Sequence, residues 1–167
     1  MSELFEKSDS QSSWIKTSSD CPGLRTLLNE DRRILFLGVG NVLRSDDGVG
    51  VYICNNIQTS EYINTICVEV SIENYISKIQ KTDADILVIL DCMDFKKESG
   101  YWSLVDIQEI DEYIINTHNI SLHNLSHFFD TSVYLLGIQP LNLNFGENLS
   151  PSVAGSADEI IKIINKR

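Results

Sequence analysis

The sequence predicts an α/β fold: a single domain in which a twisted, mainly parallel β-sheet is flanked by helices on both faces, as in phosphorylase-like and hydrolase-like proteins. Three observations lead to this prediction. Short apolar runs, typical of buried strands, recur along the chain. Amphipathic helical stripes alternate with them, which is typical of parallel sheets covered by helices. The length of 167 residues suits one domain with a sizeable core.

The domain is expected to begin after a polar segment. Residues 1–31 are rich in serine and acidic residues and are interpreted as an N-terminal extension with one short helix at Leu24–Leu28. The α/β domain is expected over residues 32–167. It opens with a buried strand at Ile34–Leu37, because this apolar run ends at a glycine.

The later elements follow the same alternation. Apolar residues recur every fourth position over Val49–Ile57 and predict a helix after a glycine-rich turn. Further strands are expected at residues 65–70, 86–90, 101–105 and 133–138, and further helices near residues 72–79, 122–129 and 151–164. Ser71 is expected to cap the second of these domain helices, and Ser150 with Pro151 to start the last one.

The charge balance narrows the class of partner. The chain carries 24 Asp and Glu against 13 Lys and Arg, a formal net charge of -11. Such a surface repels phosphate, so we expect no nucleic acid and no membrane partner, and a cation or a basic peptide fits better. The start of the chain has no signal-peptide pattern and no apolar run could span a bilayer, so a cytoplasmic location is expected. The four cysteines form no C-x-x-C pair, which favours reduced thiols.

The segment from residue 38 to residue 50 is the most informative in the chain. Its glycine-rich turn between a strand and a helix is typical of dinucleotide-binding sites, where a helix start holds a pyrophosphate. Here Leu43 replaces the third glycine of that motif, and Asp46 and Asp47 stand where the phosphate would lie. These carboxylates would repel an anion and attract a cation.

A structural alternative is that Asp46 and Asp47 only cap the helix that follows. A single helix N-cap needs only one aspartate, so capping does not explain the second one. In addition, Gly48 and Gly50 in the first turns of a helix each cost about 1 kcal/mol relative to alanine. Close approach by another chain or a ligand would explain these glycines.

Asp91 is the second candidate carboxylate. It directly follows the apolar run at residues 86–90, at the carboxyl end of a central strand. Ligands of open parallel sheets bind outside the carboxyl ends of the strands, near a switch in strand order, so Asp47 and Asp91 can face one cavity. Alternatively, Asp91 only caps its own loop.

All three histidines lie between residues 118 and 127. His123 and His127 have the spacing of a zinc-peptidase helix, but Asn124 stands where that motif needs glutamate, which favours a solvated pair. His118 lies on the loop before this helix. Two aspartates and one imidazole suit zinc, nickel or manganese and leave coordination positions open. Without the aspartates, His118 would be interpreted as an ordinary loop histidine.

Several motifs recur here in a set order. They are Gly38-x-Gly40-Asn41, Asp46-Asp47-Gly48-x-Gly50, the strand ending in Asp91, Thr117-His118-Asn119 and Gly137-Ile138-Gln139-Pro140. In this order they resemble the hydrogenase maturation proteases, in particular the members that process hydrogenase-3-type and archaeal enzymes. The resemblance covers about residues 33–165, and several ordered motifs are more specific than any single one.

The resemblance implies an endopeptidase that removes the C-terminal extension of a [NiFe]-hydrogenase large-subunit precursor after nickel insertion, with nickel as the recognition signal. It implies that Asp47, Asp91 and His118 contact the metal and that Asp47 and Asp91 serve catalysis. The nickel is carried by the precursor, and other divalent metals can occupy the site. The precursor is the expected partner of a monomeric protein.

The chain departs from the family in places. Glu69 stands where many members have aspartate followed by two glycines, Ser121 replaces a usual proline, and His123 is a fallback ligand. No Ser-His-Asp or Cys-His nucleophile set is recognisable. Cys92 adjoins Asp91, but a neighbouring carboxylate raises the pKa of a thiol and makes it less reactive. The mechanism that remains is attack on the peptide bond by water, assisted by a metal or a carboxylate. The alternative is a non-catalytic nickel-checkpoint or chaperone protein that binds the same precursor.

Overall fold

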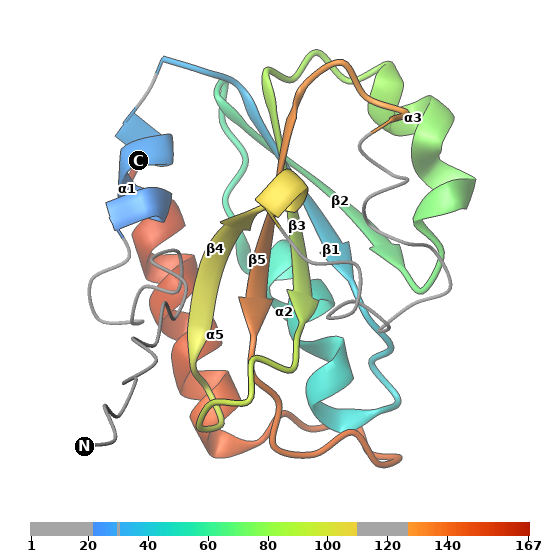
Figure 1. Ribbon diagram of the computed structural model, residues 1–167, viewed down its shortest axis with the longest axis vertical. Coiled ribbons are helices and arrows are strands. Elements are labelled where there is room, and N and C mark those ends of the chain that lie inside the picture. Colours follow the sequence, from blue (N-terminus) through green and yellow to red (C-terminus); the bar gives the residue numbers. More distant parts are fainter. Residues whose placement is uncertain (1–21, 30, 110–126) are drawn as a thin grey trace, which may run out of the picture.

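The computed structural model describes residues 22–29, 31–109 and 127–167, and it confirms the predicted α/β class (Figure 1). Five strands form one sheet in the order β2-β1-β3-β5-β4. The strands are β1 (Ile34–Val39), β2 (Ile63–Glu69), β3 (Ile86–Cys92), β4 (Trp102–Asp106) and β5 (Ser132–Ile138). Only β4 runs antiparallel to its neighbour, so the described sheet is mainly parallel.

The helices cover both faces of this sheet. The α-helices are α1 (Pro22–Asn29), α2 (Val49–Asn56), α3 (Ile76–Gln80) and α5 (Pro151–Ile164). Short 3-10 turns lie at η2 (Ser45–Gly48), η3 (Ile72–Tyr75) and η4 (Ile107–Glu109). Helices α1, α2 and α5 pack on one face, and α3 lies across the other (Figure 1). The expected short helix at Leu24–Leu28 is therefore present as part of α1, and its leucines are buried in the core.

Alternation of side chains along the central strands fills both layers of the core. Phe36 and Val88 point to the side of α2 and α5, whereas Leu35 and Ile89 point to the side of α3. Every residue of β1 and β3 is buried. Each large apolar side chain buried in this way contributes about 1.5–3 kcal/mol relative to its exposed form. The sheet is thus held rigidly where its carboxyl ends carry polar groups.

Some boundaries and caps differ from the sequence-based prediction. Strand β3 continues two residues further, so Asp91 lies within it. Ser71 occupies an N-cap position but makes no side-chain cap, and a 3-10 turn rather than an α-helix follows it. Most of the helix predicted at residues 122–129 lies outside the described residues. Phe129, its last apolar position, is not helical and instead packs against the core immediately before β5.

Helix α5 begins as predicted but is capped differently. Ser150 occupies the N-cap position and Pro151 the first turn. The Ser150 hydroxyl makes no bond to a helix N–H and instead donates to Asp46 Oδ2 at 2.8 Å. The start of α5 is therefore fixed by a residue more than a hundred positions earlier in the chain.

Gly50 lets α2 lie directly against the sheet. A Cβ at Gly50 would stand 2.0 Å from Leu90 O and 2.3 Å from Val39 O, both of them backbone atoms. The close approach expected from this glycine is thus made by β1 and β3 of the same chain. The contact sets the position of α2, and with it the residues just before the helix.

We expect Gly50→Ala to lower the free energy of unfolding by about 3 kcal/mol, because helix and strands must separate to admit the methyl group. The matched control is Gly155→Ala in α5, where a Cβ meets nothing within 4 Å. That change should raise stability by up to about 1 kcal/mol through helix propensity. Urea unfolding measures both, and equal small effects would show that the packing of Gly50 is not tight.

Candidate active site

The loop after β1 returns the chain to the end of its own strand. Gly40 has a φ of 133°, and a Cβ there would stand 1.8 Å from Asp47 O, so both conformation and space require glycine. Asn41 Oδ1 accepts a hydrogen bond from the Leu43 N–H at 2.9 Å, an Asx turn that tightens the loop. Asp47 is thereby brought back over the carboxyl end of β1.

Three buried side chains meet at this point. Asp47, Asp91 and Cys92 each offer one ligand atom, and these atoms all lie within 4.8 Å of one another. The Asn41 N–H donates to Asp47 Oδ2 at 3.2 Å, and Cys92 Sγ donates to Asp47 Oδ1 at 3.3 Å. The Cys92 N–H donates to Asp91 Oδ1 at 2.8 Å. This is the only group of potential metal ligands of its kind among the described residues.

The topology of the sheet explains why these residues converge. The chain leaves β1 to form β2 on one side and then crosses to form β3 on the other side of β1. The strand order therefore switches between β1 and β3, the place where open α/β sheets bind ligands. Asp47 follows β1 and Asp91 lies at the end of β3, so the structure brings together the two carboxylates that the sequence analysis selected. Their roles stay a prediction.

The cluster contains two acidic groups, the carboxyl groups of Asp47 and Asp91. Two buried carboxylates at short range repel each other, and either a cation or a shared proton relieves the repulsion. Carboxylate oxygens with a thiol or an imidazole form a borderline ligand set, suited to zinc or nickel. The donor set therefore fits a divalent transition metal better than a phosphate.

Cys92 contributes to the cluster as a thiol. Burial raises its pKa, and the negative charges of Asp91, Asp47 and Asp46 raise that pKa further. This confirms the expectation that Cys92 is a poor nucleophile. Its membership of the cluster was not anticipated, although its position next to Asp91 at the end of a strand is a signal that could have indicated it.

Asp46 has a different role from its neighbour. Its buried carboxylate accepts hydrogen bonds from the N–H groups of Leu141, Asn142 and Ser150 and from the Ser150 hydroxyl, at 2.6 to 2.9 Å. Burial alone would raise the pKa of Asp46, but the hydrogen bonds from Ser150, Asn142 and Leu141 together lower it. Neither Asp46 nor Asp47 is the N-cap residue of the helical turns that follow β1, since Arg44 and Gly48 hold those positions. Asp46 instead joins two loops.

The loop after β3 is held by Gln139, at the end of β5. Gln139 Oε1 accepts from the N–H groups of Phe95 and Lys97 at 2.7 and 3.3 Å, and Nε2 donates to Asp94 Oδ1 at 3.2 Å. Gly137, opposite Asp91 in the sheet, lies under this loop, where a Cβ would stand 2.7 Å from the Phe95 ring. The motif around Gln139 therefore shapes the segment that follows Asp91.

Three of the other residues considered in the sequence have different outcomes. His118 and its fallback His123 lie outside the described residues. Glu69 ends β2 with a φ of 52° and an exposed side chain, and its carbonyl accepts a hydrogen bond from the Gly40 N–H at 2.9 Å. Its contribution to the site is thus made by its backbone, and its left-handed conformation is one that glycine adopts more readily.

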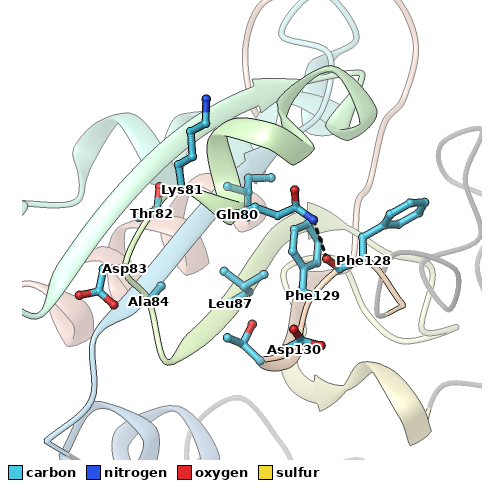
Figure 2. Close-up of a pocket in the computed structure, with 11 residues that line it drawn as sticks. Gln80, Lys81, Thr82, Asp83, Ala84, Leu87, Phe128, Phe129 and Asp130 are labelled. Carbon is cyan, nitrogen blue, oxygen red and sulfur yellow. Dashed lines mark hydrogen bonds between the residues drawn. The ribbon is translucent and has the colours of Figure 1, made fainter.

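A separate hollow lies at the opposite end of the sheet (Figure 2). It has a volume of about 560 Å³ and is lined by the end of α3, the segment between α3 and β3, Leu87 of β3 and the segment before β5, which includes Phe129. Gln80 Nε2 donates to Phe128 O across its edge at 3.0 Å. Asp47, Asp91 and Cys92 do not line it, so it is distinct from the carboxylate cluster.

Comparison with known proteins identifies related chains. A family model described as hydrogenase maturation protease matches residues 61–167, a stretch that contains Asp91 and Cys92. A Methanocaldococcus jannaschii protein assigned as a hydrogenase maturation protease is 26% identical over 154 residues, which cover 82% of this chain and 89% of the relative. A second such protein of that organism is 27% identical over 143 residues, 78% and 93% of the two chains.

Solved structures share the fold. The [NiFe] hydrogenase maturation protease HycI from Thermococcus kodakarensis superimposes with a TM-score of 0.76 at 22% identity, over 86% of this chain and 96% of that one. The endopeptidase HycI from Escherichia coli gives a TM-score of 0.71 at 24% identity, over 80% and 90%. In the part of the chain that the structure describes, no helix has the length and apolar character needed to cross a membrane.

Proposed function

The chain belongs to the hydrogenase maturation protease family, and from this premise we propose that it removes the C-terminal extension of a [NiFe]-hydrogenase large-subunit precursor once nickel has been inserted. The observation that carries the proposal is the convergence of two buried carboxylates, Asp47 and Asp91, at the switch point of the sheet. Such a pair suits a metal ion presented by a partner.

Asp47 and Asp91 are the proposed contacts to the nickel of the precursor, and His118 is proposed as the third. The Asn41 N–H and the Cys92 thiol hold the Asp47 carboxylate in one orientation, which lowers the cost of ordering it on binding. Because a cation relieves the repulsion between the two carboxylates, a precursor that carries nickel gains attraction there, whereas a nickel-free precursor does not.

Cleavage is proposed to follow from positioning. The nickel contact fixes the scissile peptide beside the carboxylates, water adds to its carbonyl carbon, the C–N bond breaks and the released amine takes up a proton. A carboxylate of the cluster assists the attacking water as a general base, and a metal ion held by Asp47 and Asp91 would supply Lewis-acid activation. Cys92 is not assigned as the nucleophile, because burial and the neighbouring carboxylates raise the pKa of its thiol and disfavour the reactive thiolate.

The test is incubation of the protein with the nickel-loaded and the nickel-free precursor from its source organism, followed by mass measurement of the large subunit. We expect loss of the C-terminal extension from the loaded form only. No mass loss from the loaded form would contradict proteolysis. Binding of the loaded form without cleavage would instead favour a nickel-checkpoint protein.

A further inference from the structure

Two loops beside the carboxylate cluster form one continuous surface. The loop after β1, residues 41–45, and the loop after β5, residues 141–146, are joined by backbone hydrogen bonds. The Ser45 N–H donates to Gly146 O at 2.6 Å, the Gly146 N–H donates to Leu43 O at 2.9 Å, and the Asp46 N–H donates to Asn142 O at 3.1 Å. Arg44 and Gly146 pair as an isolated parallel bridge. A Cβ at Gly146 would stand 2.7 Å from Ser45 Oγ, so the two loops are in close contact.

Asp46 holds this surface from beneath. Its buried carboxylate accepts four hydrogen bonds from the second loop and from the start of α5. Asp47, the next residue, belongs to the carboxylate cluster. The surface is thus fixed to the candidate site through consecutive residues, and both must move together.

The two loops expose a concentration of apolar side chains. Five of the nine large apolar side chains that are exposed in the described residues belong to them. We call these five the apolar rim: Val42, Leu43, Leu141, Leu143 and Phe145. Phe145 is 82% exposed and Leu141 is 69% exposed. Isolated exposed apolar residues are ordinary, but a cluster beside a functional site is typical of an interaction surface.

We infer that the apolar rim is the docking surface for the polypeptide substrate, which contacts it with apolar side chains of its own while its reacting segment lies at Asp47 and Asp91. This inference rests on the proposed function. The rim is continuous with the site, because the loop that exposes Val42 and Leu43 also supplies the Asn41 N–H to Asp47. A protein chain that reaches the carboxylates therefore covers the rim.

The charge of the molecule favours a protein over other apolar partners. A formal net charge of -11 repels anionic lipid surfaces and nucleic acid. The rim itself offers aliphatic and aromatic side chains with little competing charge, which is the composition of an interface centre. The expected complementary segment on the substrate is apolar and carries no excess of acidic residues.

The test compares two serine substitutions of exposed phenylalanines, Phe145→Ser in the rim and Phe128→Ser at the opposite end of β5. Processing of the nickel-loaded precursor is measured as kcat and KM. Equilibrium binding of the same precursor is measured in an Asp47→Asn background, which prevents cleavage. We expect Phe145→Ser to raise KM and Kd about tenfold with kcat within about twofold, and Phe128→Ser to change neither.

The outcomes separate this inference from the proposed proteolysis. If the parent protein cuts the precursor but Phe145→Ser leaves KM and Kd unchanged, the docking inference is wrong and proteolysis stands. If the parent binds without cutting and Phe145→Ser weakens binding, docking stands and proteolysis is wrong. If the parent does not bind the precursor, both are wrong.

The same variants also test two other occupants of the apolar rim, a second copy of this chain and a lipid surface. A change in sedimentation from dimer to monomer in Phe145→Ser, with unchanged precursor affinity, would make the rim an interface between copies of this chain. Loss of binding to phosphatidylcholine vesicles, again with unchanged precursor affinity, would make it a lipid surface. Either result overturns the docking inference.

Discussion

Asp47→Asn is expected to lower the rate of precursor processing by about 10³-fold or more while leaving the protein folded. Asparagine preserves the shape of the side chain and one acceptor oxygen, so the hydrogen bond from the Asn41 N–H can persist. It removes the negative charge that attracts the metal and the basic carboxylate that can accept a proton from the attacking water. Processing is measured by the mass of the large subunit, and folding by the melting temperature, which should change by only a few degrees.

The matched control is Asp158→Asn on the exposed side of α5, where the aspartate accepts a hydrogen bond from the Tyr52 hydroxyl at 3.0 Å. This change removes the same charge far from the cluster and should leave processing within about twofold, since surface substitutions seldom alter a fold. A collapsed fold in Asp47→Asn would make Asp47 a structural residue. Full activity with an intact fold would exclude it from catalysis.

Asp46→Ala is expected to cost about 3–5 kcal/mol of stability, because it leaves three backbone N–H groups and one hydroxyl without their buried acceptor. For a domain of this size that corresponds to a melting temperature lower by roughly 10 °C. The control is Glu147→Ala, which removes an exposed carboxylate from the same loop and should change stability little. Similar small effects from both variants would show that Asp46 does not hold the loops.

Asp46 also makes the stability of the folded protein depend on pH. Because hydrogen bonds depress the pKa of Asp46 in the folded protein, its contribution to stability is present above the pKa of an unfolded aspartate, about 3.9. The contribution is lost as the pH falls through the lower pKa of the folded state. Urea unfolding from pH 7 down to pH 3 should show a smaller loss of stability in Asp46→Ala than in the parent. Parallel losses would contradict this assignment.

The sequence alone predicted the fold because its strongest signals are local. The apolar runs that become β1 and β3 have no polar interruption, and their burial on both faces is what a central parallel strand requires. The same reasoning brought Asp47 and Asp91 together, since the carboxyl ends of neighbouring parallel strands share one edge. No knowledge of side-chain contacts was needed for either step.

The parts that the sequence did not predict depend on contacts between distant residues. Asp46 and Asp47 are equivalent in a motif, and only the position of the loop at residues 141–150 shows that Asp46 binds that loop while Asp47 faces the cluster. Cys92 points toward Asp47 because β3 continues past its apolar run. Ser150 was expected to cap its own helix, but a buried carboxylate is the stronger acceptor.

Gly50 shows the same difference between what the sequence indicates and what only the packed structure shows. Gly50 was correctly recognised as a position of close approach, but the approaching atoms are Leu90 O and Val39 O of the same chain, not another chain or a ligand as expected. Periodicity shows that such a residue is unusual in a helix, whereas only the packed sheet shows which atoms require it. The third proposed metal contact, His118, rests on the family resemblance.

If the carboxylate pair recognises nickel, Asp91 and the nickel of the precursor must be coupled in binding, and a thermodynamic cycle with one substitution and one metal removal measures this coupling. The affinity of the parent protein and of Asp91→Asn is measured for the nickel-loaded and the nickel-free precursor. We expect Asp91→Asn to weaken binding of the loaded precursor by about tenfold or more and to leave binding of the nickel-free precursor unchanged. Equal losses for both forms would contradict this expectation, because Asp91 would then contact the polypeptide rather than the metal.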